Sequence, residues 1–301
     1  MVTVRSYAKI NLTLDITGVK DGYHMLRSVV SSIDLSDTIR LSKRKTNRVT
    51  MHGMGSESVP PEKNNAFKAA ELFSATFGTE GADVTVYKDI PMCGGLGGSS
   101  ADAAGVLRGM QKLYGVGTDE EIKALADRLG SDTGYMLKGG YALIEGRGEI
   151  VTPIPSERTL YLLLFLPKAE VSTPQCYALY DSIGRRSEKT DVCVEAIAHG
   201  TVSEIAESFS NDLLLPAIEI APEVQTAIDE AKLFSPLGVN MTGSGSVVYA
   251  LFETRELCEW AQSRYKGKCR TIVTRTIVPK EAKEWGNPFR LSEEEIQKAR
   301  Q

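Results

Sequence analysis

The chain has 301 residues, 42% of them hydrophobic and 25% charged, which predicts a globular protein of about two domains rather than a disordered or collagen-like chain. The net charge of −4 argues against nucleic acid as a partner, because nucleic-acid binding usually needs a basic surface. The longest apolar run, residues 160–167, is too short to cross a bilayer, so no membrane partner is expected.

The N-terminal half mixes short strands with helices. Residues 9–16 alternate with a period of two, which predicts a strand with one polar face made of Lys9, Asn11, Thr13 and Asp15. Further strands are expected at residues 29–34, 38–42, 48–51 and 83–87. Helices are expected at residues 64–77, 99–114 and 119–128, the first capped by Asn64 or Asn65. The pattern predicts an α+β domain over residues 1–155.

A proline-rich segment, residues 151–158, separates this domain from a second α+β domain expected over residues 156–280. A buried strand is predicted at residues 160–166, and helices fill most of residues 173–234. Strands at residues 238–241 and 247–252 surround a second glycine- and serine-rich turn, residues 242–245. Residues 281–301 are expected to form a helical tail.

The most distinctive segment is PMCGGLGGSSADAA at residues 91–104. Its glycines allow the backbone to approach an anion, and the first turn of the following helix presents free N–H groups to it. A Walker A loop and a dinucleotide fingerprint are both disfavoured, because no lysine follows the glycines and G-x-G-x-x-G is not present. Two other interpretations remain: a mobile turn without a ligand, and a helix start capped by Ser99, Ser100 and Asp102.

Three other positions are candidates for chemistry. Asp132 follows the glycine that ends a predicted helix, where its carboxylate could accept a proton from a hydroxyl group, although an isolated aspartate in a turn more often stabilises the turn. Lys9, taken alone, would more often be a solvated charge at a strand edge. Asp21-Gly-Tyr-His24 is either a plain β-turn or a turn that presents Tyr23 and His24 to a base.

Three blocks in order resemble the GHMP kinase superfamily: SYAKINLTLDI at 6–16, PMCGGLGGSSADAA at 91–104 and MTGSGSVVYALF at 241–252. The resemblance implies a two-domain α+β kinase fold with the active site in the cleft between the domains. It also implies ATP as co-substrate with Mg²⁺. Within the superfamily, segments such as DGYHMLRSVV at 21–30 and VSTPQCY at 171–177 resemble members that act on a small cytidyl-diphosphate substrate. The implied acceptor is the 2-hydroxyl of 4-diphosphocytidyl-2-C-methyl-D-erythritol, in non-mevalonate isoprenoid biosynthesis.

The resemblance also implies roles for individual residues. The catalytic pair would be Lys9 and Asp132. The ATP-binding residues would be Asn64, Lys88, Gly94, Gly95, Leu96, Gly97, Gly98, Ser99 and Ser100, and Ser100 would also contact the magnesium bound to ATP. The substrate-binding residues would be Asn11, Tyr23, His24, Tyr177, Gly243, Ser244 and Gly245.

The chain departs from the family pattern at a few positions. Proline is usual where Tyr7 and Ser246 stand, and Val-Pro is usual where Thr133 and Gly134 stand. A divergent kinase for another small alcohol, or a catalytically silent nucleotide binder, therefore stays open. A monomer or homodimer is expected, and the five scattered cysteines without a CxxC pair suit a reducing cytoplasm.

Overall fold

A computed structural model describes residues 1–53, 59–60, 63–92, 94–184 and 186–278. Cys93 of the glycine-rich segment and the tail expected over residues 281–301 lie outside the described residues. Within the described ranges, no helix combines the length and the apolar character needed to span a membrane.

A seven-stranded sheet is built around one long strand, β3 (Tyr23–Arg44). The other strands are β1 (Val2–Asn11), β2 (Asp15–Lys20), β4 (Arg48–His52), β5 (Gly81–Tyr87), β6 (Tyr141–Gly146) and β7 (Ile150–Pro153). β1 and β2 follow one another along one edge of β3, and β5 and β6 follow one another along the other edge. The strands predicted at residues 29–34 and 38–42 are therefore parts of one strand, β3, in which Ser36 and Asp37 between them pair with Tyr7 and Ser6 of β1.

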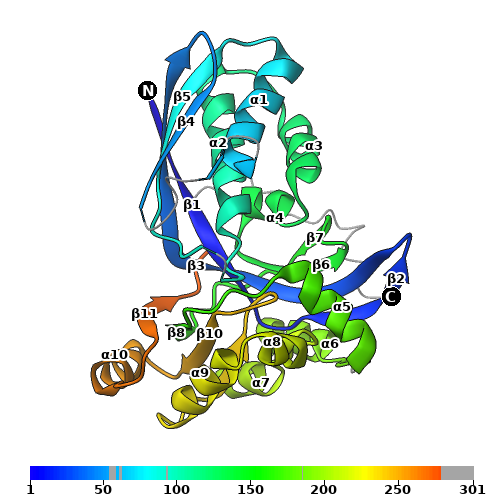
Figure 1. Cartoon of the computed structure of the whole chain (residues 1–301), viewed down its shortest axis with the longest axis vertical. Helices are drawn as coiled ribbons and strands as arrows, with labels where there is room; N and C mark the ends of the chain where they lie inside the picture. Colours follow the sequence, from blue (N-terminus) through cyan, green and yellow to red (C-terminus); the bar gives the residue numbers. More distant parts are fainter. Residues whose placement is uncertain (54–58, 61–62, 93, 185, 279–301) are drawn as a thin grey trace.

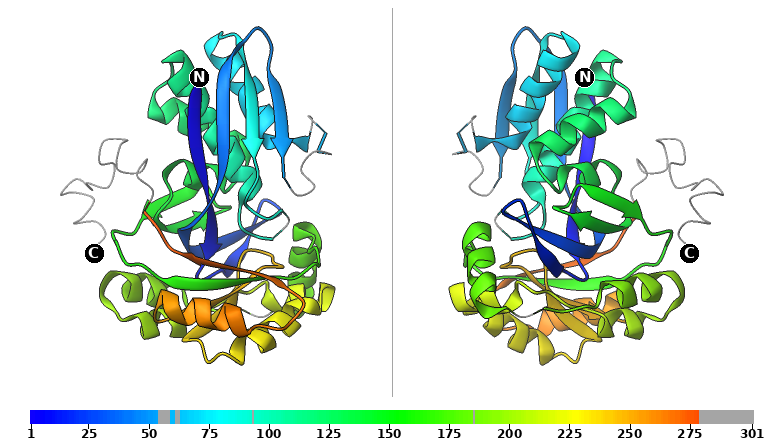
Figure 2. Two further views of the ribbon diagram at one scale, coloured as in Figure 1. Left: turned by 90° about the vertical axis from the view of Figure 1, so that its left-hand side faces the viewer. Right: turned by 90° about the vertical axis from the view of Figure 1, so that its right-hand side faces the viewer.

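Helices cover one face of this sheet (Figures 1 and 2). They are α1 (Asn65–Phe77), α2 (Gly98–Tyr114), α3 (Asp119–Leu129) and α4 (Thr133–Lys138). Asn64 caps α1 by accepting hydrogen bonds from the backbone N–H groups of Ala66 and Phe67. α2 packs closely on the sheet, since a Cβ at Gly105 would lie 2.0 Å from Ser6 Oγ. This close contact fixes the position of α2, and with it the N-terminal end of the helix, relative to the sheet.

The second half of the described chain forms a four-stranded sheet with helices around it (Figure 1). Its strands are β8 (Tyr161–Leu166), β9 (Gly238–Met241), β10 (Val248–Phe252) and β11 (Arg270–Arg275), in the order β11-β8-β10-β9. Its helices are α5 (Thr173–Ile183), α6 (Thr190–His199), α7 (Val202–Glu207), α8 (Leu214–Ile220), α9 (Glu223–Lys232) and α10 (Arg255–Arg264). In β8, Leu162 and Leu164 belong to a core that also contains residues of the first sheet. Leu163 and Phe165, on the opposite face of the strand, belong to a second core. The second sheet is thus buried on both faces, which explains its continuous apolar strands.

The polar face predicted for residues 9–16 is only partly correct. β1 ends at Asn11 and β2 begins at Asp15, so Thr13 and Asp15 do not continue the face of Lys9. The buried Asp15 carboxylate instead accepts hydrogen bonds from the backbone N–H groups of Lys189 (2.9 Å) and Thr190 (2.8 Å). Asp15, in the first half of the chain, therefore provides the hydrogen-bond acceptor for free backbone N–H groups at the N-terminus of α6, in the second half.

Candidate active site

Two cavities meet at the glycine-rich loop between β5 and α2. The smaller, of about 320 Å³, is lined by this loop and by the start of α1. The larger, of about 750 Å³, is lined by residues from both halves of the chain. Gly95, Gly97 and Ser100 border both cavities. A phosphate group held by the loop would therefore be accessible from either side.

The structure brings nearly all the predicted site residues to these two cavities. The predicted ATP-binding residues that line the smaller cavity are Asn64, Lys88, Gly94, Gly95, Leu96, Gly97, Gly98, Ser99 and Ser100. The predicted catalytic and substrate residues that line the larger cavity are Lys9, Asn11, Tyr23, His24, Asp132, Tyr177, Gly243 and Ser244. Gly245 does not line either one; its N–H donates to Thr242 O at 3.0 Å, within the turn behind Gly243.

The glycines of the loop are required by close contacts as well as by backbone conformation. Gly95 has φ 75° and Gly97 has φ 72°. A Cβ at Gly95 would lie 2.1 Å from the carbonyl oxygen of Thr242, and one at Gly97 would lie 2.2 Å from Met136 Cε and 3.2 Å from Lys9 Cγ. Within the described part of the chain, the N-cap of α2 is Gly97 and no side chain caps this terminus. Its N–H groups are thus open to an anion, and the capping interpretation of Ser99 and Ser100 is wrong.

We expect Gly97→Ala to lower kcat/KM by about tenfold or more. Alanine at a positive φ costs about 1–2 kcal/mol, and its methyl group would also displace Met136 and the stem of Lys9. Gly115→Ala is the matched control, because Gly115 ends α2 at φ 69° with open space around its Cβ position. Thermal melts should show a loss of stability in both variants, larger in Gly97→Ala, and steady-state kinetics should show a loss of activity in Gly97→Ala alone. Equal activities would contradict the placement of the loop.

Asp132 and Lys9 lie next to each other in the wall of the larger cavity. Lys9 Nζ lies 3.7 Å from Asp132 Oδ2 and donates a hydrogen bond of 2.6 Å to Asn11 Oδ1. Lys9 is buried, so it is not a solvated edge charge. Asp132 occupies the N-cap position of α4, but no side-chain cap bond is present at this described terminus. Its carboxylate is therefore available to a hydroxyl group in the cavity.

Asn11 links this pair to the second glycine-rich turn. Its Oδ1 accepts from the backbone N–H of Gly243 at 3.0 Å, and its Nδ2 donates to Ser28 Oγ at 2.8 Å. With both ends of the amide engaged, Asn11 positions Lys9 relative to Gly243. Ser244 Oγ and Thr173 Oγ1, 2.8 Å apart, add hydroxyl groups to the same wall of the cavity.

Aromatic side chains line another part of the larger cavity, which does not border the smaller one. Asp21 and Gly22, at φ 52° and 78°, form the two-residue turn of the β2–β3 hairpin and place Tyr23 and His24 at the start of β3. The His24 and Tyr177 rings stack with centroids 4.7 Å apart, and His24 Nε2 lies 2.7 Å from Asp181 Oδ1. The turn therefore also presents these side chains to the cavity.

Tyr177 remains a hydrogen-bond donor over the physiological range. Burial, with a smaller effect from the negative charge of Asp132, raises the pKa of its hydroxyl to about 12. A phenol of this kind is protonated at neutral pH and can donate to an oxygen of a ligand.

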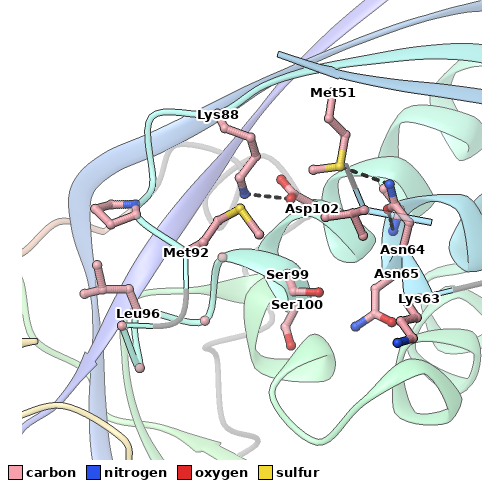
Figure 3. Close-up of a pocket in the computed structure, with 17 residues that line it drawn as sticks. Met51, Lys63, Asn64, Asn65, Lys88, Met92, Leu96, Ser99, Ser100 and Asp102 are labelled. Atoms are coloured by element: carbon pink, nitrogen blue, oxygen red, sulfur yellow. Dashed lines mark hydrogen bonds and ion pairs between the residues drawn. The ribbon is translucent and has the colours of Figure 1, made fainter. Parts of the chain in front are cut away.

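Lys88, at the edge of the smaller cavity, contacts Asp102 (Figure 3) and a second buried carboxylate, Asp37. Its Nζ forms ion pairs with Asp37 and, at 2.7 Å, with Asp102. Asp37 also accepts from the backbone N–H groups of Asp89 (2.7 Å) and Ile90 (2.9 Å), whereas Asp102 Oδ1 lacks a partner among the described residues. One oxygen of the buried Asp102 carboxylate is therefore not stabilised by a hydrogen bond from the described residues.

This arrangement predicts a pH-dependent stability. Burial raises the pKa of Asp102 to about 8, above the value of 3.8 for an exposed aspartate. The folded chain thus binds this proton more tightly than the unfolded chain. The resulting stabilisation is fully present below about pH 4 and is lost as the pH rises through the pKa of the folded state.

We therefore expect the free energy of unfolding, measured by urea denaturation, to fall as the pH rises from about 5 to about 8. Asp102 should contribute a slope of at most about 1.4 kcal/mol per pH unit. Asp102→Asn should flatten the decline, because asparagine does not titrate. Asp229→Asn, an exposed change in α9, is the control and should keep the wild-type slope. An unchanged slope in Asp102→Asn would assign the proton to another group.

The lining residues that were not predicted from the sequence include four with polar side chains, Lys63, Asn65, Arg147 and Thr173. Lys63 and Asn65 flank the cap of α1 and border the smaller cavity beside Ser99 and Ser100 (Figure 3). Thr173 and Arg147 line the larger one. The sequence signals were the VSTPQCY segment for Thr173 and an arginine between two glycines for Arg147.

Comparison with known proteins identifies the family. Residues 64–142 match the GHMP kinases N terminal domain, and residues 193–266 match the GHMP kinases C terminal model. Relatives from Caldicellulosiruptor saccharolyticus and Clostridium beijerinckii, each named 4-diphosphocytidyl-2-C-methyl-D-erythritol kinase, are 35% and 36% identical to this chain. The matches cover 92% and 91% of this chain, and 97% and 99% of the relatives.

Solved structures agree with these matches. A crystal structure of 4-(cytidine 5'-diphospho)-2C-methyl-D-erythritol kinase superimposes with a TM-score of 0.78 at 28% identity, over 92% of this chain and 99% of that one. A mevalonate kinase structure, 16% identical, covers 93% of this chain and all of its own at a TM-score of 0.69, and so shares the fold. The predicted two-domain α+β kinase fold is confirmed, and the chain belongs to the GHMP kinase family.

Proposed function

We propose that this protein transfers the γ-phosphate of ATP to the 2-hydroxyl of 4-diphosphocytidyl-2-C-methyl-D-erythritol. The observation that supports this most directly is the meeting of two cavities at Gly95, Gly97 and Ser100, with Lys9 and Asp132 on the acceptor side. Relatives at 35% and 36% identity bear the name of this activity. We assign the smaller cavity, the donor cavity, to ATP, and the larger one, the acceptor cavity, to the alcohol.

The geometry suits direct phosphoryl transfer. Asp132 takes the proton of the acceptor hydroxyl as the oxygen forms its bond to the γ-phosphorus. The bond from the γ-phosphorus to the oxygen bridging the β-phosphate breaks, and ADP leaves with that electron pair. Backbone N–H groups of the loop and the Lys9 ammonium group stabilise the charge on the transferred phosphoryl oxygens.

The residues at the meeting point fit Mg²⁺. The Ser100 hydroxyl borders both cavities and the Asp132 carboxylate borders one, and hydroxyl and carboxylate oxygens are ligands that Mg²⁺ prefers. Among the described residues, no group of three or more His, Cys, Asp or Glu side chains gathers as a metal site. Mg²⁺ would therefore be held chiefly by ATP, with Ser100 as a protein ligand, and would neutralise phosphate charge.

The acceptor cavity also suits a cytidine group. Tyr23, His24 and Tyr177 provide aromatic faces and hydrogen-bonding groups for a pyrimidine. The changes at Thr133 and Gly134 leave an ordered backbone, because both residues are buried in α4. A Cβ at Gly134 would lie 2.7 Å from Asp127 Oδ1, so this position favours glycine for packing. The altered motif is thus compatible with a placed Asp132.

A coupled assay of ADP release from purified protein tests the proposal. The panel of acceptors is 4-diphosphocytidyl-2-C-methyl-D-erythritol, mevalonate and homoserine, each with ATP and Mg²⁺. We expect release with the cytidyl substrate alone. Release with only one of the others would assign a different acceptor alcohol, and ATP binding without release in any reaction would identify a silent binder.

A further inference from the structure

Arg147 lies in the turn between β6 and β7, on the rim of the acceptor cavity. The flanking glycines adopt positive φ values, 72° at Gly146 and 114° at Gly148. The backbone N–H of Arg147 donates to Glu149 Oε2 at 2.6 Å. The turn is therefore defined by local contacts, and the exposed Arg147 side chain projects from it.

The same turn connects the two functional parts of the cavity. A Cβ at Gly148 would lie 2.9 Å from the Cβ of Ser131, the residue before Asp132. The guanidinium carbon of Arg147 lies 3.8 Å from the centroid of the Tyr23 ring, which is a close cation–π contact. Arg147 thus lies between the proposed base and the aromatic groups assigned to cytidine.

Charge distinguishes Arg147 from the other described residues around the cavity. Lys9 and Arg147 are the two lysine or arginine side chains that line it. Lys9 already contacts Asp132 and Asn11, whereas Arg147 contacts the face of Tyr23. A guanidinium stacked on a ring keeps its N–H groups at its edge, where they can bind phosphate oxygens in pairs.

The order of groups in the cavity matches the order in the acceptor. The hydroxyl to be phosphorylated must reach Asp132, and the cytosine must reach Tyr23, His24 or Tyr177. The diphosphate that joins the two parts then passes the segment between them, where Arg147 lies. Arg147 does not line the donor cavity as described, so its charge is directed to the acceptor rather than to ATP.

We propose that Arg147 binds the diphosphate of the cytidyl acceptor, with Tyr23 holding the guanidinium over the cavity. This inference rests on the proposed function, because it takes a cytidine diphosphate group as the ligand. It assigns Arg147 to recognition of the acceptor and not to the chemical step.

Calorimetric titration with two probes, cytidine and cytidine 5'-diphosphate, isolates the diphosphate from the base. Wild-type protein should bind the diphosphate at least about tenfold more tightly than cytidine, as expected for a charge-assisted contact. Arg147→Gln should abolish most of this difference while leaving the affinity for cytidine unchanged. Arg147→Lys should fall between the two, since it keeps the charge but loses the planar pair of donors. Arg264→Gln, an exposed change in α10, is the control.

Kinetics provide an independent readout. In Arg147→Gln we expect the KM for the cytidyl acceptor to rise about tenfold or more, with kcat and the KM for ATP near wild type. If cytidine and its diphosphate lose affinity equally, Arg147 acts through Tyr23 on the base and the assignment is wrong. Wild-type affinities unchanged in Arg147→Gln would also overturn it. Failure of wild-type protein to bind either probe would instead contradict the proposed function.

Discussion

Asp132→Asn is expected to lower kcat by about 10²–10⁴-fold, the usual contribution of a general base, while ATP binding remains measurable. Asparagine keeps the size of the side chain but does not accept the hydroxyl proton at neutral pH. No cap bond depends on the Asp132 side chain in the described helix terminus, but the change removes the carboxylate 3.7 Å from the buried Lys9 ammonium group, so we expect some loss of stability, which thermal melts would measure. Single-turnover kinetics with the cytidyl acceptor and calorimetric titration with ATP would measure the two effects separately.

Asp127→Asn is the matched control for this prediction. Asp127 lies on α3 and pairs with Lys123 at 2.7 Å, four residues away on the same helix. Its carboxylate does not line either described cavity, so the variant should retain wild-type kcat. Near-normal turnover in Asp132→Asn would show that another group, or solvent, takes the proton.

The sequence predicted many of the residues that line the two cavities because they belong to local segments. The glycine-rich loop, the lysine on the first strand and the aspartate after a helix are each recognisable within a few residues. Their meeting is a tertiary contact, and the evidence for it in the sequence was the order of the three blocks. The stem of Lys9 indeed packs beside Gly97, although 88 positions separate the two in the numbering.

The prediction of the fold was likewise accurate where local signals define an element and inaccurate where tertiary contacts do. The helices α1, α2 and α3 were placed within a few residues, because caps and periodicity are local signals. The extent of β3 was not, since pairing with β1 continues through the polar residues Ser36 and Asp37, while β6 and β5 pair the other edge on either side of them. The separation of Asp15 from Lys9 had a similar cause, because Asp15 is held by α6 from the other half of the chain.

The role of Lys88 illustrates what the sequence could not predict. Its two carboxylate partners are on β3 and α2, and neither is close to it in a sequence pattern. The resemblance implied only that Lys88 lies near the nucleotide. The structure adds a buried network beside the glycine-rich loop, in which Lys88 forms ion pairs with both Asp37 and Asp102.

Lys88→Met is expected to lower the free energy of unfolding at about pH 8 by about 3–5 kcal/mol, because it removes the cation beside two buried carboxyl groups, Asp37 and Asp102. Asp37 is completely buried and Asp102 nearly so. The loss should be smaller at pH 5 than at pH 8, since a buried carboxylate without a cation takes up a proton more readily. Urea denaturation at the two pH values measures both effects.

Lys123→Met is the control for this variant. It removes the Lys123–Asp127 pair, which lies on an exposed helix face, and should change stability by less than about 1 kcal/mol. A second readout separates the two roles open to Lys88. If Lys88→Met stays as stable as wild type but raises the KM for ATP, then Lys88 binds the nucleotide and the ion pairs are incidental. If stability falls and the remaining folded protein binds ATP with an affinity close to wild type, Lys88 acts by holding α2 and the glycine-rich loop against the sheet.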